Sequence, residues 1–509
     1  MRHSRRTILS AGIGLAGTAL FRPSRARAAN LKFAADPFTL GIASGYPEPN
    51  AIVLWTRLAP EPLVPGGGVP AAPVEVTWEI GTDERLRRVA RRGTTVATPD
   101  WAHAVHVEAA GLLPGRDYWY RFTSGGRQSA IGRTRTAPAP RTTPERFTLA
   151  VASCQHYEQS YFSAYRGVAA DAPDLVVFVG DYIYENSGTR RLRTHDQPEC
   201  YTLDDYRRRY ALYKSDPDLK AAHAAAPWLL VADDHEVAND YAGELSYQGD
   251  PREVFLARRA AAYQAWYEHQ PFPHRFMPVA GQQRSYTSRS FGDLVTVLML
   301  DGRQYRSPHA CEPVPLIEPC PELYLGQRTM LGDAQEQWLA TALGASTARW
   351  TLFGQQTLFA HFDQSGDGPL VYRADAWNGY PAARARLLEA IAQRKTSNPV
   401  ILSGDIHAFL VNDINARPED PESPIVATEL VATSITSIGP PQSSFDRWLA
   451  ENPNVRLARS DRRGYLRVAI GPEELRADLI AVDDVEREDS GVHVLASFDI
   501  ESGKPGVAR

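Results

Sequence analysis

Several apolar segments of this sequence end in side chains that could hold a metal ion or move a proton. The most densely charged end reads DDHE at positions 233–236 and continues to Asn239 and Asp240. Carboxylates this close together repel one another unless a cation, a proton or solvent screens their charge. A solvated acidic turn is the alternative, but the strongly apolar segment directly before it favours a functional site that contains Asp234 and His235.

Two other ends supply less common ligand types. Residues 147–153 lead into Cys154, whose thiol could act as a nucleophile, as a metal ligand or as an inert buried side chain. Residues 174–180 lead into Asp181, which is followed three positions later by Tyr184. A tyrosine ligand suits ferric iron or another hard Lewis acid. Asp181 could alternatively cap the next turn.

A fourth end places two ligand types at alternate positions. The apolar run 399–403 meets Gly404 and then Asp405 and His407. If this segment stays extended, both side chains face the same way and form a two-ligand clip. Together the four ends offer aspartates, histidines, a tyrosine and a cysteine, a set that indicates a binuclear metal site with mainly hard ligands.

These ends belong to a region in which apolar, strand-like runs alternate with amphipathic helices. We expect strands at 147–153, 174–180, 228–232, 294–300, 350–354, 400–403 and 426–432. We expect helices at 203–213, 252–268, 334–343 and 382–394. This alternation predicts a layered α/β fold with helices on the faces of a sheet core, in which the carboxyl ends of the strands form the ligand-binding edge.

The preceding region is predicted to be all-β. Short strand-like runs occur at 51–55, 74–80, 103–108 and 118–122, with Gly and Pro between them. This spacing is typical of a small β-sandwich. The Pro-rich segment 137–144 then indicates a linker. We therefore expect a β-sandwich domain over residues 30–138 and a catalytic α/β domain over residues 139–509.

The first 29 residues have the order of an export signal. The pair Arg5-Arg6 precedes a modest apolar run and small residues that predict cleavage near Ala28-Ala29. The arginine pair indicates the twin-arginine machinery as a partner, with an ordinary secretory signal as the alternative. No stretch reaches the ~18 apolar residues of a membrane span, so we expect a secreted protein, periplasmic or extracellular, without a transmembrane anchor. In such an oxidising compartment Cys311 and Cys320 are the best disulfide pair.

Composition and missing motifs exclude several functions. The 509 residues include 55 basic and 60 acidic side chains, and six of the arginines lie in the first 29 residues. The remainder is therefore acidic and lacks the basic surface of a nucleic-acid-binding protein, so we expect no nucleic-acid partner. The sequence contains no G-x-S-x-G elbow, P-loop or HExxH signature, which argues against the enzyme classes that use them.

The motifs described above resemble those of the alkaline phosphatase D family. These secreted metallophosphoesterases also include iron-dependent enzymes with phospholipase D activity. The resemblance covers essentially the whole chain and rests on residues 38–45, 53–58, 152–154, 180–185, 233–236, 300–306, 377–381 and 404–407. It implies a layered α/β/β/α metallophosphoesterase sandwich preceded by a small immunoglobulin- or fibronectin III-like β domain.

The resemblance also implies a two-metal site. Its Fe³⁺ ligands would be Cys154, Asp181, Tyr184 and His407. Asp181 would bridge to a Ca²⁺ ion that Asp234 and Asp405 also bind, and other divalent metals suit the same residues. Asn239 and Asp240 would be nearby ligands or would support the ligands.

The implied chemistry is hydrolysis of phosphate esters by a hydroxide held on the metals, with His235 and Asp181 as catalytic residues. His235 is similar to the histidine that contacts the phosphoryl oxygen or the leaving group. Arg303 would either contact phosphate or pair with Asp301. The implied activity is that of an alkaline phosphatase with phosphodiesterase activity, acting on a phosphate-ester small molecule or a phospholipid.

Three alternatives stay open on the sequence. A phospholipase D-like phosphodiesterase of the same family would need an apolar approach for acyl chains. A zinc or manganese diesterase could use the same fold. A secreted binding module without catalytic activity would use the β-sandwich instead of the strand ends.

Overall fold

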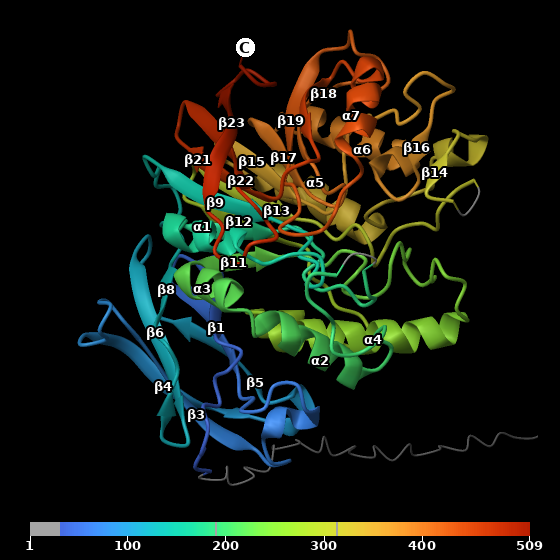
Figure 1. The fold of residues 1–509 in the computed structure, drawn as a ribbon. Coiled ribbons are helices and arrows are strands. Elements are labelled where there is room, and N and C mark those ends of the chain that lie inside the picture. Colours follow the sequence, from blue (N-terminus) through green and yellow to red (C-terminus); the bar gives the residue numbers. More distant parts are fainter. Residues whose placement is uncertain (1–30, 189–190, 312–313, 509) are drawn as a thin grey trace, which may run out of the picture.

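The computed structural model describes residues 31–188, 191–311 and 314–508. The expected export signal at residues 1–29 and its cleavage point at Ala28-Ala29 lie outside the described residues. Within the described ranges, no helix is long and apolar enough to cross a membrane. Two large β-sheets with helices on their outer faces make up most of the structure (Figure 1).

The first sheet has the strand order β23-β22-β21-β9-β10-β11-β1-β2-β5. Its centre consists of the parallel strands β9 (Phe147–Ala152), β10 (Leu175–Phe178) and β11 (Pro227–Leu230). The other members are β1 (Ile42–Glu48), β2 (Ala51–Arg57), β5 (Ala104–Ala110), β21 (Gly464–Ile470), β22 (Glu474–Val482) and β23 (Val492–Glu501). The central strands are covered on both faces, which explains why their sequences are continuously apolar.

The second sheet has the strand order β12-β13-β15-β17-β19-β18-β20. Its parallel strands are β13 (Val295–Met299), β15 (Trp350–Gly354), β17 (Pro399–Ser403) and β19 (Ile425–Val431). Antiparallel strands complete it: β12 (Thr287–Phe291), β18 (Phe409–Asn415) and β20 (Val455–Arg459). One continuous apolar core joins the two sheets, with Val151, Val177, Leu352 and Leu402 among its fully buried members.

Helices cover the outer faces of this pair of sheets. They are α1 (Ala164–Asp171), α2 (Leu203–Lys214), α3 (Pro217–Ala225), α4 (Arg252–His269), α5 (Asp333–Ala345), α6 (Pro381–Gln393) and α7 (Gln442–Trp448). Leu339 of α5 and Leu388 of α6 pack in one apolar cluster with Ile401 of the second sheet. At α2 the side chain of Thr202 accepts the amide of Asp205 and the Asp205 side chain accepts the amide of Thr202, which fixes where the helix begins.

The N-terminal region is all-β, and part of it extends the first sheet. Strand β1 pairs in parallel with β11, with Ser44 opposite Pro227. The separate sheet β4-β3-β6-β7 consists of β3 (Val74–Gly81), β4 (Val89–Ala97), β6 (Asp117–Ser124) and β7 (Arg127–Gln128), and β8 (Gly132–Arg135) also pairs with β6. Leu54 and Val107 of the first sheet share an apolar cluster with Tyr120 of the separate sheet. The sandwich therefore shares one of its two layers with the α/β region.

Two short strands that are distant in the sequence form a separate two-stranded sheet. Strand β14 (Leu316–Ile317) pairs with β16 (Tyr372–Arg373) in antiparallel register. The predicted disulfide between Cys311 and Cys320 is confirmed, and it closes the loop that carries β14. Cys154 and Cys200 are free and buried.

The strands and helices predicted in the α/β region are present, with ends that differ by only a few residues. The unpredicted elements of this region are the strands β12, β14, β16, β18 and β20 to β23 and the helices α1, α3 and α7. β21 lies directly beside β9 in the sheet although more than 300 residues separate them in the chain. Short local patterns do not reveal so distant a pairing.

Candidate metal centre

The loops that follow β9, β10, β11 and β17 meet at the carboxyl edge of the parallel strands. The amide of Cys154 donates to the carbonyl oxygen of Gly180 at 3.0 Å, which joins the first two loops. Cys154, Asp181, Asp405 and His407 all have a positive φ, of 56°, 60°, 63° and 57°. Residues other than glycine rarely adopt this left-handed backbone conformation, and such backbone strain is most common at functional sites.

A first group of ligand atoms forms around Asp181. Cys154, Asp181 and His407 each contribute one atom within 4.8 Å of the other two. The Tyr184 hydroxyl donates to Oδ2 of Asp181 at 2.8 Å and lies 3.1 Å from Nε2 of His407. Ser437 Oγ donates to the same hydroxyl at 2.7 Å and holds it in place. The structure thus brings together the four side chains that the family resemblance assigns to iron.

A second, oxygen-rich group adjoins the first through shared carboxylates. Three further sets have ligand atoms within 4.8 Å of one another: Asp181 with Asp234 and His235, Asp233 with Asp234 and Asp405, and Asp234 with Asp240 and Asp375. Asp181 belongs to both groups, and Asp234 belongs to each of these three sets. This sharing is the geometry expected of two neighbouring cations with a bridging carboxylate.

The expected two-ligand clip at Asp405 and His407 is wrong. Strand β17 ends at Ser403, and both residues adopt left-handed rather than extended backbone conformations. As a result the two side chains enter different groups, Asp405 the oxygen-rich one and His407 the one around Cys154.

Burial and mutual repulsion disfavour the ionised form of the carboxylates in the oxygen-rich group. Burial, reinforced by neighbouring Asp375 and Asp234, raises the pKa of Asp240 to about 7. Burial and the same neighbours raise the pKa of Asp405 to about 6, although the guanidinium of Arg373 opposes the change. A bound cation would relieve this repulsion and favour the ionised carboxylates.

The donor atoms fit cations of two different kinds. Oδ1 of Asp181 and Oδ1 of Asp234 are buried and accept no hydrogen bond within the described part of the chain. A buried carboxylate oxygen without a donor is unfavourable unless a cation lies beside it. Burial raises the pKa of Cys154 and of Tyr184 well above their ordinary values, and Asp181 adds to both shifts. Metal loading through these two groups would therefore release protons.

His235 is positioned by a carboxylate outside the cluster. Its Nδ1 lies 2.7 Å from Oε2 of Glu185, while the amide of Asn239 donates to Oε1 of the same residue at 2.9 Å. The amide of Asp240 donates to Oδ2 of Asp234 at 2.7 Å. Asn239 therefore takes part through its backbone, and Asp240 lies within the oxygen-rich group.

Glu236 organises the loops rather than facing the ligand atoms. Its carboxylate accepts the amides of Asp181 at 3.2 Å, Tyr182 at 2.5 Å and Asp233 at 2.7 Å. The Gly180 backbone has a φ of 116°, and a Cβ there would clash with Asp233. Close approach of these two loops thus depends on a glycine and on one buried acceptor.

Arg303 is committed to carboxylates. Its guanidinium bonds Asp233 and lies 2.7 Å from Asp375, and its side chain is 1% exposed. The alternative of a side-chain pair with Asp301 is wrong, because Arg303 donates to Asp301 through its backbone amide, at 3.0 Å, and its guanidinium bonds other carboxylates. Arg303 therefore balances charge beneath the oxygen-rich group.

Comparison with known proteins agrees with this architecture. The sequence profile of the PhoD-like phosphatase family matches residues 149–479, and that of the PhoD-like phosphatase N-terminal domain matches residues 24–138. The chain belongs to the PhoD-like phosphatase family. It is 42% identical over 486 residues to alkaline phosphatase D of Bacillus subtilis (strain 168), covering 94% of this chain and 83% of that protein. A solved structure described as "Structure of PhoD" superposes with a TM-score of 0.90 at 41% identity, covering 94% of this chain and 92% of that one.

Two residues of this PhoD-like centre were missed in the sequence. Asp375 joins Asp234 and Asp240 in a set of close ligand atoms and also pairs with Arg303. Arg373 lies 3.9 Å from Oδ2 of Asp405 through its Nε. The only signal was their position just before the motif at 377–381, because neither follows a strand of the main sheets.

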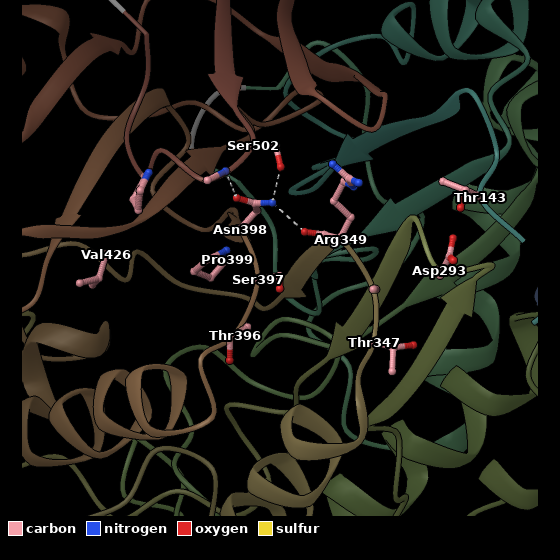
Figure 2. A pocket seen from close by; sticks show the side chains of 13 residues that line it. Thr143, Asp293, Thr347, Arg349, Thr396, Ser397, Asn398, Pro399, Val426 and Ser502 are labelled. Atoms are coloured by element: carbon pink, nitrogen blue, oxygen red, sulfur yellow. Dashed lines mark hydrogen bonds between the residues drawn. The ribbon is translucent and has the colours of Figure 1, made fainter. Parts of the chain in front are cut away.

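A cavity of about 600 Å³ lies away from the PhoD-like centre. Its lining includes Arg349, which precedes β15, and Pro399, which begins β17 (Figure 2). It is therefore at the amino ends of strands whose carboxyl ends carry the candidate ligands. Half of its labelled side chains carry a hydroxyl group, and the Asn398 side chain donates hydrogen bonds to the carbonyl oxygen of Arg349 and to Oγ of Ser502. This lining offers no group of metal-binding side chains.

Proposed function

We propose that this chain is an exported, metal-dependent phosphatase that hydrolyses phosphate monoesters at the edge formed by Asp181 and Asp234. The observation that carries the proposal is the sharing of these two carboxylates between neighbouring sets of ligand atoms. Membership of the PhoD-like phosphatase family supports phosphoric ester hydrolysis as the reaction. Two adjacent cations suit this reaction because the transferred phosphoryl group carries charge on several oxygens.

The two groups would hold different cations. Cys154, Asp181, Tyr184 and His407 would bind Fe³⁺. Asp234 and Asp405, with Asp181 bridging and Asp240 close by, would bind Ca²⁺, which prefers oxygen ligands. When bound, such cations supply Lewis-acid charge to the phosphoryl oxygens and lower the pKa of water.

The side chains around the cations would then position the substrate and move a proton. Held by Glu185, His235 would donate a proton to the departing alkoxide from its other ring nitrogen. Its pKa supports this role: burial alone would lower it, but Glu185, Asp234 and Asp181 together raise it well above the ordinary value. Arg303, enclosed by Asp233 and Asp375, would hold the ligand loops together instead of contacting phosphate.

Export by the twin-arginine machinery forms part of the proposal. It is supported by Arg5-Arg6 in the sequence and by the Cys311–Cys320 disulfide, which is typical of an oxidising compartment. Folding before transport would allow the metal site to be filled in the cytoplasm. Cleavage near Ala28-Ala29 would release the mature enzyme to the periplasm or the medium.

Parallel assays test the proposal. Purified protein would be offered p-nitrophenyl phosphate, its bis ester and phosphatidylcholine, and its metals would be measured by elemental analysis. We expect iron and calcium and the highest kcat/KM on the monoester. Dominant activity on phosphatidylcholine would instead identify a phospholipase D-like enzyme. Zinc or manganese in place of iron would refute the metal assignment, and full activity after complete metal removal would refute the mechanism.

A further inference from the structure

We propose that Arg373 is the residue that binds the phosphoryl group of the substrate and gives the site its preference for phosphate monoesters. This inference rests on the proposed function of the same site. It concerns an arginine on the two-stranded sheet β14–β16, outside the strand-end loops that carry the metal-binding side chains.

The backbone of β16 directs Arg373 toward the metal centre. Neighbouring residues of a strand point to opposite faces. Tyr372, the other residue of β16, is buried in a small apolar cluster that includes Ile317 of β14. Arg373 projects from the opposite face of this two-stranded sheet, and there its Nε lies 3.9 Å from Oδ2 of Asp405.

The guanidinium of Arg373 is not committed to a protein partner. A separation of 3.9 Å is too long for a hydrogen bond. Its Nε is buried without a hydrogen-bond partner among the described residues. Yet the side chain as a whole is 37% exposed. Arg373 thus offers donors both toward Asp405 and toward the solvent-facing side of the site.

The other arginines of the centre are used differently. Arg303 bonds Asp233 and Asp375, and Arg306 bonds Asp375 and the carbonyl oxygen of Tyr241. Both side chains are at most 1% exposed. Nη2 of Arg303 has no hydrogen-bond partner among the described residues, but it is buried. Neither side chain could move toward a substrate without breaking buried ion pairs, which is costly. Among these three, Arg373 alone combines proximity to the ligand atoms with exposure.

The ligand chemistry follows from the shape of the side chain. A guanidinium presents parallel N–H donors that match two phosphoryl oxygens, and charged hydrogen bonds of this kind are strong. A monoester dianion has one more free oxygen and one more negative charge than a diester. A cationic donor beside Asp405 therefore stabilises a bound monoester, or inorganic phosphate, more than it stabilises a diester.

The test compares the substitutions Arg373→Met and Arg373→Lys with the matched control Arg349→Met. Arg349, labelled in Figure 2, has a similarly exposed side chain, 43%, with one ion pair to Glu473. It directly precedes β15 and so lies at the edge of the sheet opposite to the metal centre. Binding of inorganic phosphate to the metal-loaded enzymes would be measured by calorimetry. KM and kcat would be measured on p-nitrophenyl phosphate and on its bis ester, and bound metal by elemental analysis.

We expect Arg373→Met to weaken phosphate binding by about 10- to 100-fold, the loss typical of charged hydrogen bonds. KM for the monoester should rise correspondingly, and the bis ester should be affected less. Arg373→Lys should recover only part of the loss, because it keeps the charge but not the paired donors. Metal content and the Arg349→Met enzyme should match wild type.

Two results would overturn the assignment of Arg373 alone. One is unchanged phosphate affinity in an Arg373→Met enzyme. The other is a weaker affinity explained entirely by lost metal, which would make Arg373 a support for Asp405. If the wild-type enzyme with its full metal complement neither binds phosphate nor hydrolyses esters, the proposed function fails and this inference fails with it.

Discussion

Nδ1 of His235 lies 2.7 Å from Oε2 of Glu185, so the imidazole ring is held by a carboxylate that is not itself among the close ligand atoms. The Glu185 side chain is fully buried. A bound cation would offset the negative charges of Asp181 and Asp234, which raise the pKa of His235. Glu185 would still be the hydrogen-bond partner of the ring. A hydrogen bond to a buried carboxylate favours the protonated ring and fixes its direction, which are the two requirements of a proton donor.

Replacing His235 by Ala should lower kcat most for substrates with poor leaving groups. An alkyl phosphate needs protonation of its departing alkoxide, and loss of a positioned acid typically costs about 10²- to 10⁴-fold in rate. The p-nitrophenolate ion departs without a proton, so p-nitrophenyl phosphate should lose less. The measurement is kcat for both substrates with bound metal verified as unchanged. Equal losses on the two substrates would contradict proton donation by His235.

Glu185→Gln should move the alkaline limb of the kcat profile to lower pH. The Glu185 charge raises the pKa of His235, so the protonated, active ring persists to higher pH in the wild-type enzyme. Removing that charge lowers the pKa, and the proton donor is lost earlier as pH rises. Profiles of kcat against pH for an alkyl phosphate test this. An alkaline limb at the same pH as in the wild-type enzyme would show that His235 does not determine this part of the profile.

Substitutions at Asp181 and Asp405 should have different effects on bound metal. Both residues have a positive φ, a conformation that Asn tolerates, so Asp181→Asn and Asp405→Asn preserve the backbone. Asp181 belongs to both groups of ligand atoms, and its variant should lose iron and calcium together with turnover. Asp405→Asn should lose calcium and retain iron. Elemental analysis of the two proteins decides, and near-normal activity of Asp181→Asn would exclude its bridging role.

Tyr184→Phe should change the colour of the iron-loaded enzyme. The ring lies between those of His235 and His156, at centroid distances of 4.2 Å and 4.3 Å, so Phe can occupy the same place. Only the hydroxyl that contacts Asp181 and His407 is removed. A phenolate on Fe³⁺ gives a visible charge-transfer absorption, which the variant should lack. An unchanged visible spectrum with full iron content would place Tyr184 outside the coordination sphere.

The sequence was informative wherever a local pattern determined the structure. Apolar strands that end in Cys154, Asp181 or Asp234 predicted a shared edge, and the structure has one. The extended conformation expected at Asp405 failed because an apolar strand gives no signal of the backbone angles that follow it. The pairing of Arg303 with Asp301 failed for a different reason. Proximity in sequence suggested it, but Asp233 and Asp375 reach the guanidinium from distant loops.

Arg373 shows which features of the site no local pattern could reveal. Its position depends on the pairing of β14 with β16, where Leu316 lies opposite Arg373 across more than fifty residues of chain. Each of these strands spans only two residues, too few for any periodicity to be recognised. The joining of β1 to β11 also escaped prediction, because β1 was not recognised as a strand and the pattern of β11 does not reveal its neighbours.

Opening the Cys311–Cys320 disulfide should weaken substrate binding without unfolding the enzyme. The bond closes the loop that carries Leu316, which pairs with Arg373 in the two-stranded sheet. A crosslink over so short a loop stabilises the folded loop by on the order of 2–3 kcal/mol relative to its unfolded conformations. A double Ser variant should therefore let Arg373 move away from Asp405, so that KM rises more than kcat falls.

The large apolar core between the two main sheets does not include strands β14 and β16, so the temperature of the main unfolding transition should shift little. Steady-state kinetics and thermal unfolding of the double Ser variant give both quantities, and wild-type enzyme treated with a reductant provides an independent route to the same state. If Arg373→Met is made in the double Ser background, the two effects on KM should not add, because both act through the same guanidinium. Fully additive effects would show that the disulfide influences the site by another route.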